Sequence, residues 1–160
     1  MASSLEKDNT RLRYLVDSFS QVNSSLVLET VLENTLKRAT ELTAAAVGSI
    51  ALIDESCRYL EFVQSTDRAR DKLLELRIPI DKGIAGHVVR TGQPIRVEDC
   101  YSDPRFYSEV DHAVGSKTRT YLCVPLVADG AVIGTVQIMN RADGASFTHE
   151  DQEVLTSFAQ

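Results

Sequence analysis

The residues best suited to bind a small ligand lie in segment 103–126, which opens with the pair Asp103–Pro104. This pair favours a helix start, because an Asp side chain caps free backbone N–H groups and Pro fits the first helical position. Exposed N–H groups at a helix start attract anions, and nearby positive charge adds to the attraction. Three cations lie close by in a chain of net charge -6: Arg105, Lys117 and Arg119. The segment predicts either an anion site or an ordinary basic surface loop.

The remaining reactive side chains do not form a set typical of catalysis or metal binding. The histidines at positions 87, 112 and 149 are not at metal-ligand spacing, and the serines lack a Ser/His/Asp arrangement. The three cysteines, Cys57, Cys100 and Cys123, are odd in number and are typical of reduced thiols. We therefore expect a chain that is not an enzyme and that holds no metal or cofactor.

Composition narrows the class of protein. The chain has 160 residues, of which 43% are hydrophobic and 25% charged, as in an ordinary globular domain. An isoelectric point near 5.1 argues against nucleic acid as a partner. No run approaches the roughly 18 apolar residues of a membrane span, and no signal-peptide pattern opens the chain. These features predict a cytoplasmic protein with no membrane contact in this segment.

A heptad pattern marks residues 1–26 as a coiled-coil-like helix. Apolar residues recur seven apart along the seam Leu5, Leu12, Phe19 and Leu26. The alternate positions are Asp8, Leu15 and Val22, of which only Asp8 is polar. Such a narrow apolar seam needs a second helix. We expect a homodimer, with packing against another helix of the same domain as the alternative. Because the last helix reaches Gln160 without a stop signal, we also expect a longer parent chain.

Residues 27–160 predict one α+β domain. A helix over 28–43, beginning after caps at Ser24 and Ser25, has its apolar positions at helical spacing, so one stripe should face a core: Leu28, Val31, Leu32, Leu36, Ala39 and Leu42. Strands are expected over residues 45–54, 58–65, 76–80, 94–98, 120–128 and 131–140, with helices from Gly83, Asp103 and Thr148. Asp129–Gly130 favours a type I′ hairpin turn. The order predicts a six-stranded, mostly antiparallel sheet with helices on both sides.

Several sequence runs in residues 28–160 resemble the GAF domain, a small-molecule-sensing and dimerising module. They are Gly83-Ile84-Ala85-Gly86-His87-Val88, Thr91-Gly92, Asp103-Pro104-Arg105-Phe106, Asp111, Gly115, Lys117-Thr118-Arg119, Leu122-Cys123-Val124-Pro125-Leu126, Ile133-Gly134 and Asn140. The chain is most similar to the cyclic-nucleotide-binding GAF domains of phosphodiesterases and adenylate cyclases. The resemblance implies a GAF-type fold and a pocket for a small ligand.

The resemblance also implies pocket residues. The backbone amides of Ile84 and Ala85 correspond to those that approach a cyclic phosphate, and Tyr107 to a residue of the short helix beside it. Thr118 corresponds to a threonine that supports phosphate and ribose, while Ser49 and Gln137 correspond to positions facing the base. Arg105 and Phe106 complete the expected ligand-binding set.

Two departures from the family pattern concern ligand choice. Val114 replaces a threonine, and Gln137 replaces an acidic residue that can pair with guanine. A neutral amide both donates and accepts hydrogen bonds, so it can pair with either purine base. The relatives' Asn-Lys pair and downstream Phe-x-x-x-Asp-Glu are matched here by Asn140, Arg141, Phe147 and Asp151, with Gln152 in place of Glu. In the family this pattern braces the pocket, and Arg141 keeps the charge that would pair with Asp151.

Three functions follow from these features. The first is a sensor that binds cAMP or cGMP and relays binding through dimer helices to an output domain absent from this chain. The second is a ligand-free GAF dimerisation scaffold of a signalling protein. The third is a GAF-type reductase, bilin or iron module. The third is disfavoured, because Cys100 and Cys123 lack the reductase's local sequence and no Cys lies next to a His.

Overall fold

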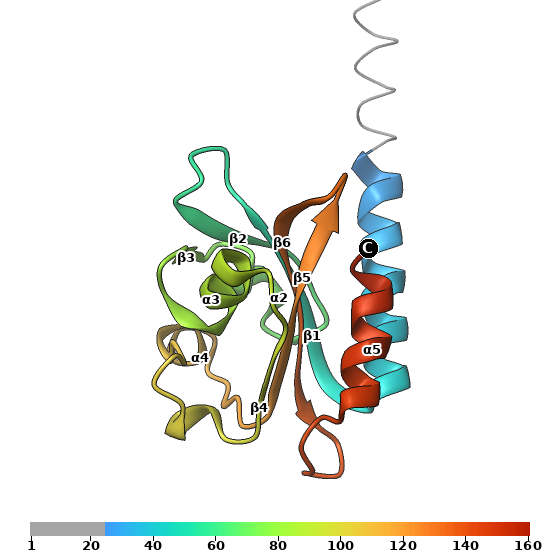
Figure 1. Ribbon diagram of the computed structural model, residues 1–160, viewed down its shortest axis with the longest axis vertical. Coiled ribbons are helices and arrows are strands. Elements are labelled where there is room, and N and C mark those ends of the chain that lie inside the picture. Colours follow the sequence, from blue (N-terminus) through green and yellow to red (C-terminus); the bar gives the residue numbers. More distant parts are fainter. Residues whose placement is uncertain (1–24) are drawn as a thin grey trace, which may run out of the picture. The chain divides into compact units, whose positions relative to one another are not determined.

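The computed structural model of the protein describes residues 25–160 (Figure 1). The predicted heptad helix over residues 1–26 lies outside them except for its last two positions. Glu33–Gln160 form one compact unit, and the residues before Glu33 belong to another. A helix over residues 25–43 is followed in order by β1 (Ala45–Ile53), β2 (Tyr59–Ser65), α2 (Arg70–Leu73), β3 (Arg77–Pro79), α3 (Gly83–Thr91), β4 (Ile95–Val97), the 3₁₀ helix η1 (Cys100–Ser102), α4 (Glu109–Val114), β5 (Tyr121–Ala128), β6 (Ala131–Arg141) and α5 (His149–Phe158).

The strands form one sheet in the order β3-β2-β1-β6-β5-β4, and each neighbouring pair is antiparallel. The two longest strands, β1 and β6, lie at its centre and place Ser49 opposite Gln137. Helical residues 33–43 and α5 cover one face, while α2, α3 and α4 cover the other (Figure 1). This arrangement confirms the predicted α+β, six-stranded, mostly antiparallel GAF-type architecture.

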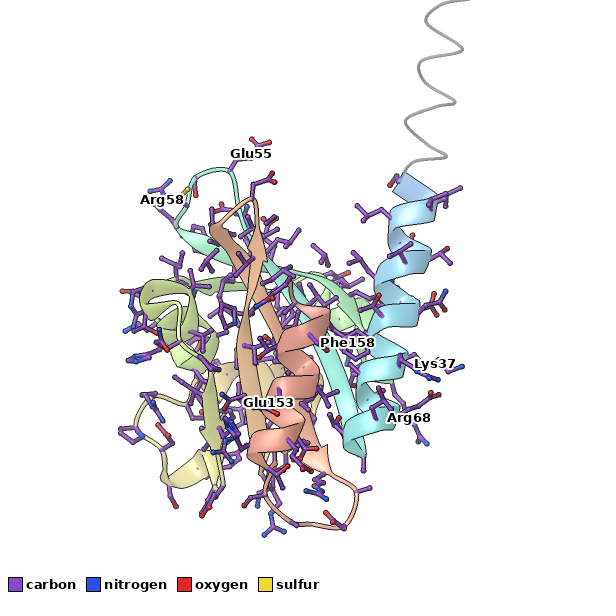
Figure 2. All side chains as sticks on the ribbon, turned by 45° about the vertical axis from the view of Figure 1, so that its right-hand side comes forward. Lys37, Glu55, Arg58, Arg68, Glu153 and Phe158 are labelled. Atoms are coloured by element: carbon purple, nitrogen blue, oxygen red, sulfur yellow. The ribbon has the colours of Figure 1, made fainter. Side chains whose placement is uncertain are left out.

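Most predicted turns and caps are also confirmed. Gly92, with φ of 66°, ends α3 in the left-handed conformation. Asp129 and Gly130 both have positive φ, 51° and 76°, as a type I′ turn requires. Thr148 and Asp151 form a reciprocal capping box at the start of α5. Figure 2 shows Glu55 and Arg58 at the tip of the β1–β2 hairpin.

The predicted apolar stripe of the first described helix is partly wrong. Ser25 is already helical, so the helix does not begin at Leu28. Within the domain, Leu36 and Ala39 are buried, whereas Leu42 is 55% exposed. The buried face is set by Gly48 on β1, since a Cβ there would lie 2.9 Å from Leu36 Cδ1. The helix therefore packs closely against β1 at Gly48, where the missing side chain leaves room for Leu36. Lys37 points outward (Figure 2), and Leu28 and Val31, in the preceding unit, are exposed.

The predicted helix start at Asp103 is wrong as well. Asp103 instead opens a tight turn, because the N–H of Phe106 donates to its carbonyl at 3.1 Å. Pro104 occupies the turn position that its fixed φ favours. The carboxylate of Asp103 accepts from the Arg105 N–H at 2.8 Å and from its guanidinium at 2.7 Å. The helix itself, α4, begins at Glu109.

Candidate ligand-binding site

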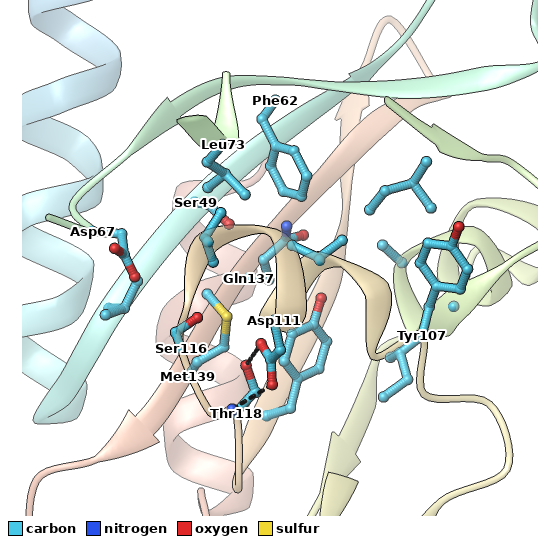
Figure 3. A pocket seen from close by; sticks show the side chains of 18 of the residues that line it. Ser49, Phe62, Asp67, Leu73, Tyr107, Asp111, Ser116, Thr118, Gln137 and Met139 are labelled. Carbon is cyan, nitrogen blue, oxygen red and sulfur yellow. Dashed lines mark hydrogen bonds between the residues drawn. The ribbon is translucent and has the colours of Figure 1, made fainter. Parts of the chain in front are cut away.

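A cavity of about 100 Å³ lies between the sheet and the three helices α2, α3 and α4 (Figure 3). Its walls are largely apolar and come from strands β1, β2, β3, β5 and β6 as well as from the helices. Seven of the eight predicted ligand-binding residues line it: Ser49, Ile84, Ala85, Phe106, Tyr107, Thr118 and Gln137. The eighth, Arg105, lines a separate outer cleft. The fold thus gathers residues from five strands, three helices and their loops around one space.

The floor of the cavity carries two buried polar side chains. Ser49 is 1% exposed, and its Oγ has no hydrogen-bond partner among the described residues. Gln137, directly opposite on β6, is 2% exposed, and its Oε1 accepts a hydrogen bond from Thr135 Oγ1 at 2.8 Å. Figure 3 shows both side chains on the cavity side of the sheet. A buried hydroxyl without a partner is costly, so this floor is suited to a polar ligand atom.

The start of α3 provides the second polar feature. Lys82 precedes the helix and supplies no side-chain cap. Within residues 25–160, the N–H groups of Ile84 and Ala85 have no acceptor. Gly83 adopts φ of 74°, and a Cβ on it would lie 3.1 Å from Tyr107 Cβ. The close approach of Tyr107 therefore needs glycine here, and the uncapped N–H groups favour an anion.

Asp111 joins α4 by hydrogen bonds to the loop that precedes β5. Its carboxylate accepts the backbone N–H and the hydroxyl of Thr118, each at 2.7 Å, and the hydroxyl of Tyr101 at 2.8 Å. The hydrogen bond from Tyr101 to this carboxylate raises the pKa of the phenol above its usual range. The sequence motifs assigned Asp111 no role in the pocket. Its signal is that Asp111 and Val114, three residues apart, share one face of α4, where a carboxylate beside apolar residues needs buried partners.

None of the three cations of the opening segment, Arg105, Lys117 and Arg119, lines the cavity. Arg105 is paired with Asp103 at 2.7 Å, and Lys117 Nζ lies 5.6 Å from the centre of the Tyr101 ring. Among the described residues, no Lys, Arg or His lines the cavity. Any anion held here would therefore be stabilised by backbone N–H groups and not by a charged side chain.

The Asn140–Arg141 pair supports the cavity wall, and Asn140 is itself one of the lining residues. Asn140 donates to Lys117 O at 3.0 Å and accepts from the Arg119 N–H at 2.7 Å. These bonds fix the loop that carries Thr118. Arg141 Nη1 lies 3.3 Å from Asp151 Oδ2, which joins β6 to the capping box of α5. Phe147 is buried at 4% exposure, and its carbonyl oxygen accepts from Arg96 Nη1 at 3.3 Å.

The buried thiols are unsuited to nucleophilic chemistry. Burial raises the pKa of Cys123 to about 12, and burial together with nearby carboxylates raises the pKa of Cys100 to about 12. Both thiols are therefore protonated near neutral pH. In the part of the chain that the structure describes, no group of three or more His, Cys, Asp or Glu side chains is placed to hold a metal ion. No helix in that part is both long and apolar enough to cross a bilayer.

Comparison with known proteins agrees with this geometry. A model of the GAF domain matches residues 27–160. The chain is 30% identical over 151 residues to the dual 3′,5′-cyclic-AMP and -GMP phosphodiesterase 11 of Drosophila melanogaster, covering 86% of this chain and 10% of that protein. It is 44% identical over 85 residues to a probable 3′,5′-cyclic phosphodiesterase, pde-5, of Caenorhabditis elegans, covering 53% of this chain and 12% of that protein.

Solved structures show the same fold. The GAF domain of a phosphoenolpyruvate-protein phosphotransferase from Coxiella burnetii superposes with a TM-score of 0.72 at 21% identity, covering 92% of this chain and 87% of that one. The chain spans only about a tenth of the length of the phosphodiesterases it matches. From the family match over residues 27–160 and the six-stranded fold, the chain belongs to the GAF domain family.

Proposed function

We propose that this GAF domain is a regulatory module that binds a cyclic nucleotide, cAMP or cGMP, in the cavity between the sheet and helices α2 to α4. The observation that carries the proposal is the Ser49 hydroxyl, which is buried in the cavity without a partner. In this proposal the module binds its ligand without transforming it and needs no cofactor. The matched regions of phosphodiesterases, whose substrates are cyclic nucleotides by name, support this ligand class.

The cavity offers a place for each part of such a ligand. The cyclic phosphate carries one negative charge and suits the free N–H groups of Ile84 and Ala85 at the start of α3. The base would lie against Ser49 and Gln137 on the floor, and Thr118 would support the sugar and phosphate. Apolar walls would cover the ring faces.

Ligand entry requires the cavity to enlarge. Its volume of about 100 Å³ is below the roughly 300 Å³ at which drug-sized ligand pockets begin. One wall is the segment between Asp103 and Asp111, which includes Phe106 and Tyr107 and whose hydrogen bonds join residues close in sequence. Outward movement of this segment would give the domain distinct free and bound states, and a ligand shifts such an equilibrium only by binding one state better.

Relay to an output domain would use the flanking helices of a homodimer. In the unit that precedes Glu33, apolar side chains are more than half exposed: Leu26, Val27, Leu28 and Val31. Large apolar side chains clustered on one short helical stretch favour burial against a partner. A second copy of this chain supplies a partner of matching character.

Calorimetric titration of the protein with cAMP and cGMP tests the proposal directly. Binding of either nucleotide should be accompanied by stabilisation of about 2.7 kcal/mol at a ligand concentration of 100 times the dissociation constant. 5′-AMP is the matched control ligand, because its dianionic, open phosphate differs from the cyclic monoanion. If neither cyclic nucleotide binds at millimolar concentration, the sensor proposal is wrong.

The second candidate is a ligand-free dimerisation scaffold. The small volume of the cavity favours it, because the apolar walls already lie close together without a ligand. This candidate predicts a dimer in solution whose stability is unaffected by either nucleotide. The same titration, combined with sedimentation analysis, separates the two candidates.

A further inference from the structure

We propose that Thr135 is a specificity-determining residue: it fixes the orientation of the Gln137 amide so that the cavity floor presents an N–H donor to the ligand. The part of this inference that concerns the nucleobase rests on the proposed function. Thr135 does not line the cavity and is 0% exposed. It therefore acts through Gln137, as a positioning residue, and not by touching the ligand.

The contact that orients the amide is buried. Thr135 and Gln137 are two residues apart on β6, so their side chains lie on the same face of the sheet. The Thr135 hydroxyl donates to Gln137 Oε1 at 2.8 Å. Cys123, which is paired with Gln137 across β5 and β6, brings its Sγ within 3.9 Å of the same oxygen. Two donors thus converge on one side of the amide.

The opposite amide orientation satisfies these donors less well. If the amide were rotated by 180°, its NH₂ group would face the Thr135 hydroxyl and the Cys123 thiol. The hydroxyl could accept from that NH₂ group, but its own hydrogen would then be left with Cys123 Sγ, a weaker acceptor than an amide oxygen. The rotation would therefore replace a strong buried hydrogen bond by a weak one, and the thiol would lose its contact with the amide oxygen. The hydrogen bonds around the amide therefore favour the orientation in which Gln137 Oε1 faces Thr135.

The consequence appears at the cavity floor. Within the described chain, Gln137 Nε2 donates to no side-chain or backbone acceptor, and the facing Ser49 Oγ is likewise without a partner. The floor thus offers an amide donor beside a hydroxyl that can donate or accept. A ring nitrogen with a free lone pair, such as N1 of adenine, complements the amide. In the same base pose, guanine carries N1–H at this ring position and would face the amide donor to donor.

The structure therefore favours cAMP over cGMP by about tenfold, the effect of one mismatched buried hydrogen bond. Thr135→Val keeps the side-chain shape but removes the donor, so the amide can rotate and present its oxygen. We expect the ratio of cAMP to cGMP affinity, measured by calorimetry, to fall at least fivefold in Thr135→Val and to be retained in Thr135→Ser. Gln137→Glu, which presents only acceptors, should reverse the preference.

Thr43→Val is the matched control, because it removes another buried threonine hydroxyl, bonded to Ala39 O, on the helix that covers the opposite face of the sheet. It should leave the affinity ratio unchanged. A Thr135→Val protein that retains the wild-type ratio would overturn the inference, as would a wild-type protein that prefers cGMP.

A ligand-independent measurement separates this inference from the proposed function. In the free protein, NMR should show nuclear Overhauser effects from the Gln137 side-chain NH₂ protons to Ser49 that are stronger than those to Thr135 and Cys123. The reverse pattern overturns the inference even if cAMP binds. If neither nucleotide binds, the sensor proposal fails, and this pattern still decides whether Thr135 orients the amide.

Discussion

The carboxylate of Asp111 receives both the backbone N–H and the side-chain hydroxyl of Thr118, each at 2.7 Å. This double contact joins α4, which covers the cavity, to the loop that leads into β5. Asp111 is 4% exposed and Thr118 is 6% exposed, so the contact is shielded from water. The helix that lies over the cavity is therefore fixed at its first turns, while the segment before it is held mainly by short-range contacts.

Substitution of Asp111 should show how much this contact contributes. Asp111→Asn keeps one acceptor, and its NH₂ group can donate to the Thr118 hydroxyl, so we expect a loss of about 1 kcal/mol in the free energy of unfolding. Asp111→Ala leaves the buried Thr118 N–H without an acceptor and should cost about 3 kcal/mol. Urea denaturation measures both values. Losses close to zero in both variants would show that the Thr118 contacts contribute little.

Asn140 should be sensitive for a different reason. It combines a positive φ of 57° with two side-chain bonds to the loop backbone at Lys117 and Arg119. Asn140→Gly removes the bonds but suits the backbone conformation, and we expect a loss of about 2 kcal/mol. Asn140→Ala should cost about 1 kcal/mol more, because alanine is strained at positive φ. If Gly and Ala destabilise equally in chemical denaturation, backbone strain at this position is negligible.

The sequence predicted elements whose signals are local. The Asp129–Gly130 turn, the Thr148 capping box and the Gly92 helix end depend on residues within a few positions of one another, and all three are present. The exposure of Leu42 could not be predicted, because the buried face of its helix depends on Gly48 of another element. A helical period shows that a face exists but does not show which neighbour it meets.

The candidate site was predicted unevenly for the same reason. Motif positions pointed to seven residues that line one cavity, whose role in binding a ligand stays a prediction. Arg105 lies outside that cavity because it pairs with Asp103, a choice of rotamer and partner that spacing does not encode. Thr135 was missed because its effect passes through a hydrogen bond to Gln137, and only a three-dimensional contact reveals such a bond.

Gly86 should tolerate no side chain. A Cβ there would lie 2.5 Å from the carbonyl oxygen of Ile80, which also accepts from Arg90 Nη1. Because the obstacle is backbone, relief requires α3 to shift, and we expect Gly86→Ala to cost about 1 to 3 kcal/mol of unfolding free energy. Gly144→Ala is the control: its Cβ would meet nothing within 4 Å, so only its positive φ of 74° is penalised. Thermal unfolding that ranks Gly144→Ala as the worse variant would contradict the close approach of α3 to Ile80.

The two buried thiols should make stability fall at alkaline pH. Their pKa is raised from 9.0 to about 12 in the folded state. An unfolded chain loses these protons above pH 9, whereas the folded chain keeps them to about pH 12. The contribution to stability is therefore complete below pH 9 and is lost as pH rises from 9 to 12. Between pH 8 and pH 10, the wild type should lose about 3 kcal/mol more than a Cys100→Ala/Cys123→Ala variant. Parallel urea curves at the two pH values provide the measurement, and equal losses would show that the thiols ionise in the folded protein.

The exposed apolar side chains before Glu33 should control association. Leu28 and Val31 are 58% and 53% exposed and lie three residues apart, so they share one side of the helix. Replacement of both by serine should raise the dimer dissociation constant at least tenfold in sedimentation equilibrium, because two buried apolar contacts are removed from each chain. Leu42→Ser is the matched control, since Leu42 is exposed to a similar extent, 55%, but belongs to the domain beyond Glu33. If Leu42→Ser dissociates the dimer and the double variant does not, the contact between copies lies on the domain, and the proposed relay through the preceding helix is wrong.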